Sequence, residues 1–136
     1  MPQILIEAPQ GIGDEAKLQM VREITAAVDE AFRVPDVRVW LREYPPGSVA
    51  QDGRIGAEPI RPLVFLEVPE LDDIDARRAM SNRISAAIAA GYEGLANTAE
   101  TLVLMNHYPL EYAGFGGRLL SDDPDAVEAM RQLNHR

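Results

Sequence analysis

The sequence predicts an α+β protein made of two tandem β-α-β units, which form one four-stranded sheet with two helices on one face. Three observations predict this fold. Strand-like and helix-like segments alternate along the chain, the first half of the chain reappears in the second half, and 46% of the 136 residues are hydrophobic. A chain of this length suits a single domain with its own core.

The first segment, residues 2–8, is rich in Ile and Leu and predicts a strand. Pro9 and Gly11 break this strand. A helix is expected from Asp14, its N-cap, to about Phe32, because the apolar residues recur at three- and four-residue spacings. This spacing predicts one buried stripe along the helix.

Residues 37–44 predict a second strand with two different faces. Val37, Val39 and Leu41 share one face, which we expect a helix to cover. The opposite face combines basic and aromatic side chains, namely Arg38, Trp40 and Arg42. That face is too basic and aromatic for an ordinary core.

The remaining elements follow the same order. A polar segment contains the pair Asp52-Gly53, which predicts a short hairpin. A third strand at residues 62–68, a second helix from about 72 to 90 and a fourth strand at 101–108 come next. A glycine-rich turn and a short terminal helix, packed on the surface, complete the chain.

An internal repeat relates the two halves. When residues 2–32 are shifted by sixty positions, eight are identical, where chance would give roughly two. The second strand of each half aligns after a further shift of four residues, so that Tyr44 corresponds to Tyr108. We therefore expect a single domain over 1–136, with repeats at 2–58 and 62–120 and a helical tail at 121–136.

The repeat leaves one face of the sheet uncovered. Each β-α-β crossover is expected to be right-handed, which brings both helices to the same face. The other face has no element left in the chain to cover it. An apolar face of this kind requires a partner, so we expect an oligomer in which these sheets face each other.

Composition excludes several classes of function. The net charge is −9, with 13 Lys and Arg against 22 Asp and Glu, which excludes nucleic acid and anionic membranes as partners. The chain has no cysteine, so it has no disulfide, thiolate zinc site or cysteine nucleophile, and it fits a reducing cytoplasm. No signal peptide and no apolar run long enough for a membrane span are expected.

Pro2 directly follows the initiator methionine. Initiator methionine is normally removed before a residue as small as proline, which would give Pro2 a free secondary amine. An α-amino group has a pKa near about 7.7–8.0, and burial lowers that pKa. A neutral amine serves as a general base or as a nucleophile. The alternative is that Pro2 merely permits the removal of Met1.

Four segments, in this order, carry a resemblance to a known family: Met1-Pro2-Gln3-Ile4-Leu5-Ile6, Gly11-Ile12-Gly13-Asp14-Glu15, Val37-Arg38-Val39 and Gly114-Phe115-Gly116-Gly117. The chain resembles the 4-oxalocrotonate tautomerase branch of the tautomerase superfamily, in particular members with two fused units, over about residues 2–120. The resemblance implies a tautomerase-like β-α-β fold, a homotrimer, a catalytic amino-terminal proline and arginines that bind substrate carboxylates. No cofactor or metal is implied.

The family's functional positions match this chain in part. Pro2 falls on the catalytic base, Arg38 on a substrate-binding arginine and Asn106 where some relatives have an active-site asparagine. The family's loop arginine is replaced by Ile12, and by Asp72 in the second half. These departures leave fewer cations for a substrate than the family has.

Further candidates lie in the second half. The water-activating carboxylate of related dehalogenases falls on or beside Phe115, which is instead a candidate for an apolar wall that keeps Pro2 neutral. Arg118, in a glycine-rich turn, is a candidate to reach a neighbouring pocket. Tyr108 and Tyr112 are candidate donors to an enolate oxygen, although anchoring of loops is an alternative role.

For some residues a structural or solvent-facing role is expected or is the alternative. Arg38 binds carboxylates well because a guanidinium is bidentate, but a surface or intersubunit salt bridge is its alternative role. His107 and His135 are not spaced with carboxylates as a metal site requires. Trp40 is expected to pack between subunits.

The sequence therefore predicts a cytoplasmic isomerase, a keto–enol tautomerase that acts on a small carboxylate-bearing substrate with Pro2 as the base. One alternative is a Pro2-dependent lyase or hydratase on the same scaffold. A second alternative is a catalytically idle trimeric binding protein.

Overall fold

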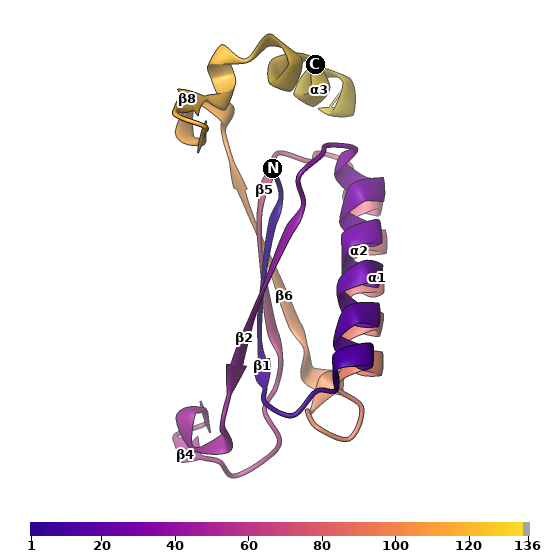
Figure 1. The fold of residues 1–136 in the computed structure, drawn as a ribbon, viewed down its shortest axis with the longest axis vertical. Coiled ribbons are helices and arrows are strands. Elements are labelled where there is room, and N and C mark those ends of the chain that lie inside the picture. The colour runs from indigo at the N-terminus through magenta and orange to yellow at the C-terminus, as the bar shows by residue number, and fades with distance from the viewer. Residues whose placement is uncertain (135–136) are drawn as a thin grey trace.

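A computed structural model of the chain describes residues 1–134, and His135 lies outside the described residues. One sheet and a pair of long helices form two layers (Figure 1). The sheet contains β1 (Gln3–Pro9), β2 (Arg38–Tyr44), β5 (Leu63–Pro69) and β6 (Leu102–Tyr108). The helices are α1 (Asp14–Phe32), α2 (Ile74–Gly91) and the short α3 (Pro124–Asn134). Short 3-10 turns cover Pro46–Ser48, Thr98–Glu100, Leu110–Tyr112 and Leu120–Asp122.

The predicted four-stranded sheet is confirmed, with the strand order β2-β1-β5-β6. β1 is parallel to β2 and β5 is parallel to β6, whereas the central pair β1–β5 is antiparallel. Gln3 lies opposite Arg38 in the first half, and Leu63 lies opposite Leu102 in the second. The same pairing therefore recurs in the two halves, with β5 sixty positions after β1 and β6 sixty-four positions after β2.

The core lies between the sheet and the helices α1 and α2. Alternate residues of the central strands are fully buried, including Ile4, Ile6, Val64 and Leu66. The expected helical stripes face them, with Met20, Ile24 and Val28 on α1 and Met80, Ile84 and Ile88 on α2. Each such aliphatic side chain contributes about 1.5–3 kcal/mol when it is fully buried.

The two helices approach closely near the end of α2. A Cβ at Gly91 would lie 3.0 Å from the sulfur of Met20. At this distance the Met20 side chain would have to shift by a few tenths of an ångström to accept a methyl group at position 91. The space between the helices at this position therefore suits a small residue.

The expected N-cap of α1 is wrong. Gly13 is the N-cap and Asp14 is the first helical residue, so the Asp14 carboxylate does not cap the helix. Its charge still lies at the end of the helix where negative charge is favourable. In α2, the side chain of Asp73 does cap the helix and accepts hydrogen bonds from the backbone of Asp75 and Ala76 at 2.9 and 3.1 Å.

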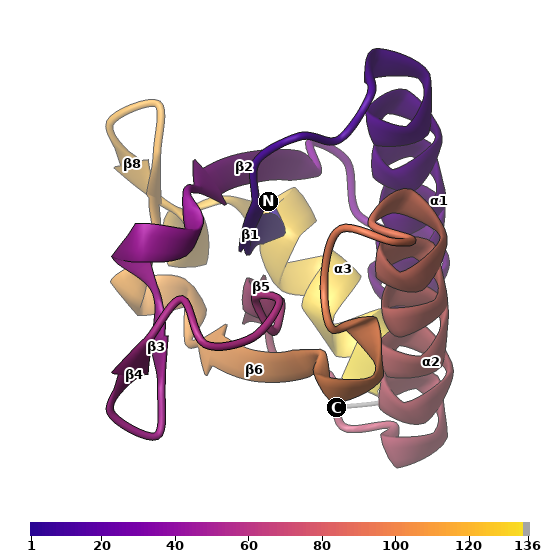
Figure 2. The same ribbon diagram turned by 90° about the horizontal axis from the view of Figure 1, so that it is seen from below.

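Two small hairpins extend from the sheet. The first contains β3 (Ala50–Gln51) and β4 (Arg54–Ile55), and the second contains β7 (Gly114–Phe115) and β8 (Arg118–Leu119). The hairpin expected at Asp52-Gly53 is confirmed, and both of its turn residues have positive φ, as a type I′ turn requires. Figure 2 shows both hairpins on the side of the sheet away from α1 and α2.

The expected terminal helix, α3, lies across the end of the sheet near the N-terminus (Figure 1). Its last residue, Asn134, accepts a hydrogen bond from the backbone N–H of Asp72 at 2.8 Å and donates one to the carbonyl of Glu70 at 3.0 Å. These bonds fix α3 to the loop between β5 and α2. Within residues 1–134, no helix is both long enough and apolar enough to cross a membrane.

Candidate active site

Pro2 is buried at the end of the sheet that α3 covers. Its carbonyl accepts a hydrogen bond from the backbone N–H of Arg38 at 3.1 Å, so the neighbouring strand β2 fixes its position. In the described chain, Met1 acylates the nitrogen of Pro2. Pro2 therefore becomes a base only after Met1 is removed.

Burial and two opposite charges act on the N-terminal amine. Burial lowers the pKa of the Met1 amine below its usual value of 8.0, and the positive charge of Arg38 lowers this pKa further. Asp36 opposes both effects and raises the pKa. Asp36 and Arg38 also form an ion pair with a distance of 3.1 Å between Nη2 and Oδ2. An amine at this position is biased toward its neutral form.

Tyr108 lies beside the N-terminus, on β6. Its hydroxyl donates a hydrogen bond to the carbonyl oxygen of Met1 at 3.2 Å. Burial, followed by the negative charge of Glu67, raises the pKa of Tyr108 above its usual value. The hydroxyl therefore stays protonated near neutral pH and acts as a donor at the Pro2 end of the sheet.

A row of polar residues crosses the uncovered face of the sheet at this end. Adjacent strands pair Arg38 with Gln3, Gln3 with Glu67, and Glu67 with Asn106. Asn106 donates a hydrogen bond to Glu67 at 3.0 Å. Asn106 lies two strands away from β1, about 10 Å at the usual strand spacing, whereas Arg38 lies on the adjacent strand. Arg38 is therefore the closer of the two candidates to Pro2.

Phe115 and Arg118 lie opposite each other on the β7–β8 hairpin, and both are exposed. The guanidinium of Arg118 donates a hydrogen bond to the carbonyl oxygen of Asp122 at 2.7 Å. The structure thus groups four of the five sequence-predicted site residues in two pairs, while the fifth, Asn106, lies on β6. Pro2 and Arg38 lie together at the end of the sheet, whereas Phe115 and Arg118 lie together on a projecting hairpin.

A cavity of about 160 Å³ adjoins the N-terminus, and we call it the N-terminal chamber. Met1 lines the chamber together with Leu110, Leu120, Ala126, Ala129 and Met130. Three of these residues belong to α3. Sequence reasoning missed this chamber, because the thin apolar edge of α3 does not reveal where the helix docks.

The opposite end of the sheet carries a different arrangement. The carboxylate of Glu7 accepts a hydrogen bond from the hydroxyl of Tyr44 and forms an ion pair with Arg42 at 2.7 Å. This hydrogen bond raises the pKa of Tyr44. Pro62 corresponds to Pro2 in the second half. Its nitrogen is part of a tertiary amide within the chain and cannot act as a base. Chemistry by an amino-terminal proline is therefore restricted to the Pro2 end.

The described residues offer no obvious metal site. Within residues 1–134, no group of three or more His, Asp or Glu side chains is arranged to hold a metal ion. His107 is exposed on β6.

The two linked β-α-β units, with a proline at the start of the first strand, define a tautomerase-type fold. The chain matches no known family model. No curated protein matches it either. Among solved structures, it is similar to native fused 4-OT, with a TM-score of 0.78 and 24% identity over 89% of this chain and 98% of that chain.

Two further structures share this fold. A fused 4-OT wild-type asymmetric trimer gives a TM-score of 0.76 and 24% identity over 86% of this chain and 94% of that chain. Pt0534 inactivated by 2-oxo-3-pentynoate gives a TM-score of 0.73 and 23% identity over the same shares of the two chains. The predicted tautomerase superfamily fold, in its fused 4-OT form, is therefore confirmed.

Proposed function

We propose that the protein is a cofactor-independent keto–enol tautomerase, in which the free amine of Pro2 moves a proton within a small carboxylate-bearing substrate. The observation that carries this proposal is the buried position of Pro2 beside Arg38, at an end of the sheet where burial lowers the pKa of the Met1 amine. A neutral amine next to a cation combines a base with a carboxylate-binding group. The base moves the proton, and the cation holds the substrate and stabilises the negative charge of the enolate.

In the proposed reaction, neutral Pro2 removes a proton from the enol hydroxyl or from the carbon beside a carbonyl. Arg38 binds the substrate carboxylate and stabilises the developing negative charge. Pro2 then returns the proton at the other atom. Proton transfer by a positioned base contributes typically about 10²–10⁴-fold to the rate.

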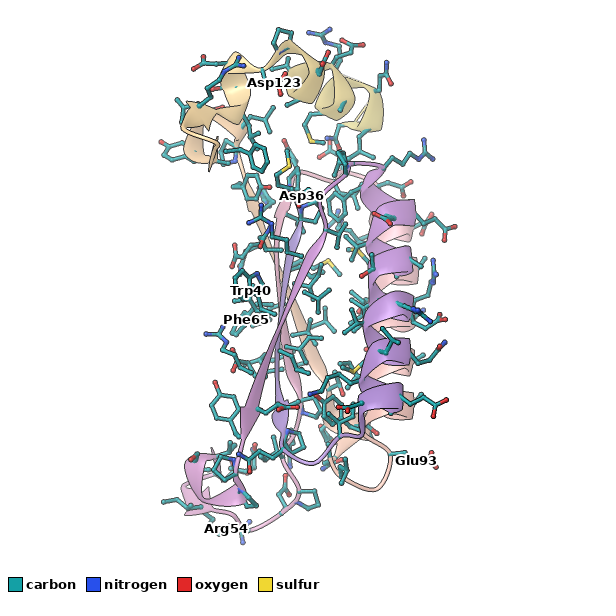
Figure 3. All side chains as sticks on the ribbon, in the orientation of Figure 1. Asp36, Trp40, Arg54, Phe65, Glu93 and Asp123 are labelled. Carbon is teal, nitrogen blue, oxygen red and sulfur yellow. The ribbon has the colours of Figure 1, made fainter. Side chains whose placement is uncertain are left out.

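The proposal includes a homotrimer. On the uncovered face of the sheet, Trp40, Leu5, Phe65 and Leu104 form a central apolar row. Trp40 is 54% exposed and Leu104 is 39% exposed, so this row is available to a partner. Figure 3 shows Trp40 and Phe65 on this face, away from the helices. The trimeric assembly of a structurally similar fused 4-OT supports the same assembly here.

In such a trimer, the hairpin residues act on a neighbouring subunit. Phe115 would form an apolar wall beside that subunit's Pro2, and Arg118 would add a second cation. Asn106 is assigned a hydrogen bond to the substrate. A location in the cytoplasm, predicted from the sequence, remains part of this proposal.

The test combines intact mass spectrometry with 2-oxo-3-pentynoate, the compound that inactivates Pt0534. We expect the purified protein to lack Met1 and to form a single adduct that digestion maps to Pro2. The matched control is Pro2→Ala, which also permits removal of Met1 but replaces the secondary amine with a primary one. We expect slower labelling of this variant, because a primary amine is a weaker nucleophile than the secondary amine of proline.

Other outcomes would redirect the assignment. Retained Met1, or labelling spread over several residues, would overturn the role of Pro2 and favour an idle binding protein. A Pro2 adduct without exchange or ketonisation of any 2-oxo acid would favour a Pro2-dependent lyase or hydratase.

A further inference from the structure

The N-terminal chamber has acidic residues in its wall, whereas the charged residue beside Pro2 on β2 is the cation Arg38. The only charged side chains that line the chamber, among the described residues, are Asp123 and Asp125, and both are acidic. Arg38, the cation beside Pro2, is not part of its wall. Met1, which directly precedes Pro2, does line the chamber, so a substrate at Pro2 with its carboxylate at Arg38 can extend its other end into apolar and acidic surroundings.

The size of the chamber suits a short apolar group. A dry apolar cavity of about 150 Å³ is known to accept benzene, so a cavity of about 160 Å³ holds a comparable volume. Met1 itself contributes an unbranched apolar side chain to the wall. Removal of Met1 would enlarge this space beside the amine.

The helix that forms the wall is held in place. Asn134 binds the backbone of Glu70 and Asp72, as described above, and it also donates to the carbonyl of Met130 in its own helix at 3.2 Å. Asp123 accepts a hydrogen bond from the N–H of Asp125 at 3.0 Å, which orders the first turn of α3. Figure 3 places Asp123 at the end of the molecule that α3 covers. The wall of the chamber is therefore held at both ends of α3 by hydrogen bonds.

We propose that the N-terminal chamber binds the apolar tail of the substrate, so that the enzyme prefers 2-oxo monocarboxylates with an aliphatic tail to dicarboxylates. This inference rests on the proposed tautomerase function. Arg38 binds one carboxylate, and a second carboxylate in the chamber would lie among apolar side chains, with the acidic Asp123 and Asp125 as the only charged side chains of the wall among the described residues. Both the desolvation and the like charges disfavour that arrangement.

A matched pair of compounds tests the preference. 2-Oxohexanoate and 2-oxoadipate have six carbons each and differ in whether the far end is a methyl or a carboxylate. In D₂O, Pro2 would remove a C3 proton and return a deuteron, so exchange is followed by proton NMR. We expect kcat/KM for exchange to be at least about tenfold higher for 2-oxohexanoate, the scale on which small apolar differences are discriminated.

A substitution tests the role of α3 directly. Ala129→Leu fills part of the chamber, and we expect the ratio of 2-oxohexanoate to pyruvate exchange to fall about tenfold. Ala86→Leu makes the same change on the exposed face of α2, and we expect it to leave both rates unchanged. Circular dichroism and thermal unfolding of both variants identify any general loss of folding.

The outcomes separate the two proposals. If the wild-type protein exchanges none of the three acids, pyruvate included, the proposed function fails. If pyruvate is exchanged but 2-oxoadipate equals or exceeds 2-oxohexanoate, the chamber assignment is overturned and the function remains. An unchanged ratio in folded Ala129→Leu would also overturn the chamber assignment.

Discussion

The hydroxyl of Tyr108 donates a hydrogen bond to the carbonyl of Met1 across 3.2 Å, which joins the end of β6 to the first residue of the chain. Tyr44 has the corresponding place in the first half, since Tyr44 pairs with Pro9 and Tyr108 pairs with Pro69. Tyr44, however, donates to Glu7. The same residue at the same position has therefore different partners at the two ends of the sheet, and only Tyr108 reaches the N-terminus.

This difference predicts that Tyr108→Phe weakens catalysis. After removal of Met1, the Tyr108 hydroxyl would lie near the amine of Pro2 and the developing enolate. Loss of one hydrogen bond worth about 1–1.5 kcal/mol lowers a rate about tenfold. We expect kcat/KM for exchange of 2-oxohexanoate to fall by this factor.

The matched control is Tyr44→Phe, which removes the same hydroxyl at the opposite end of the sheet. We expect no change in kcat/KM, because Pro62 provides no amine there. Equal losses in the two variants would show that Tyr108 acts through stability alone.

A second prediction concerns the pH dependence of activity. The base must be neutral, so activity rises as the pH increases through the pKa of the amine. Asp36 raises the pKa of the Met1 amine. We expect Asp36 to act in the same way on the neighbouring Pro2 amine once Met1 is removed, and Asp36→Asn removes this effect. We therefore expect the acid limb of the kcat/KM profile to move to lower pH in Asp36→Asn.

Asp52→Asn removes a carboxylate in the turn of the first hairpin and serves as the control. We expect its profile to match that of the wild-type protein. An acid limb that moves to higher pH in Asp36→Asn would contradict the assignment of the limb to the N-terminal amine.

The fold was predictable because the strands and helices, and also the two β-α-β halves, appear as repeating patterns in the sequence. The strand expected at residues 2–8 is observed as Gln3–Pro9, and the helix expected to end at Phe32 does end there. Burial on one side fixes the alternation of apolar residues in a strand and their three- and four-residue spacing in a helix. The repeat then fixes the order of the elements.

The surroundings of Pro2 were predictable only in part. The hydrogen bond between Arg38 and Pro2 follows from the parallel pairing of β1 and β2. The docking of α3 leaves no such trace, because Asn134 holds it through single polar bonds to backbone atoms. Contacts of this kind depend on the final three-dimensional arrangement and have no period in the sequence.

A third prediction concerns the core. Tyr92 has no exposed surface, and its hydroxyl has no hydrogen-bond partner among the described residues. A buried hydroxyl without a partner costs about 1–3 kcal/mol. We expect Tyr92→Phe to leave the free energy of unfolding unchanged or to raise it by up to about 2 kcal/mol, measured in urea at a fixed protein concentration.

The same residue predicts an alkaline effect. The pKa of Tyr92 is raised from 10.0 to about 12. Burial is the larger cause, and the negative charge of Glu43 is the smaller one. Between these values the unfolded chain loses the proton and the folded chain keeps it, so the wild-type protein loses stability as the pH rises. The advantage of Tyr92→Phe should grow between pH 10 and 12, whereas the exposed Tyr112→Phe should show no such change.

A fourth prediction concerns the uncovered face of the sheet. Phe65 lies opposite Leu5 on β1 and Leu104 on β6, at the centre of the apolar row. In the proposed trimer, Phe65→Asp would bury a carboxylate without a partner, which costs several kcal/mol. We expect sedimentation to show a trimer for the wild-type protein and a monomer for this variant. Leu18→Asp, on the exposed side of α1, should remain trimeric.

The monomeric variant also tests how the site is assembled. If Phe115 and Arg118 act in a neighbouring subunit, folded Phe65→Asp should lose exchange activity although its own Pro2, Arg38 and Tyr108 are intact. Loss of Met1 from this variant would show that the amine is still produced. Full activity in a monomer would mean that one chain suffices, and the hairpin would have no catalytic role. A wild-type protein that is monomeric at micromolar concentration would contradict the trimer itself.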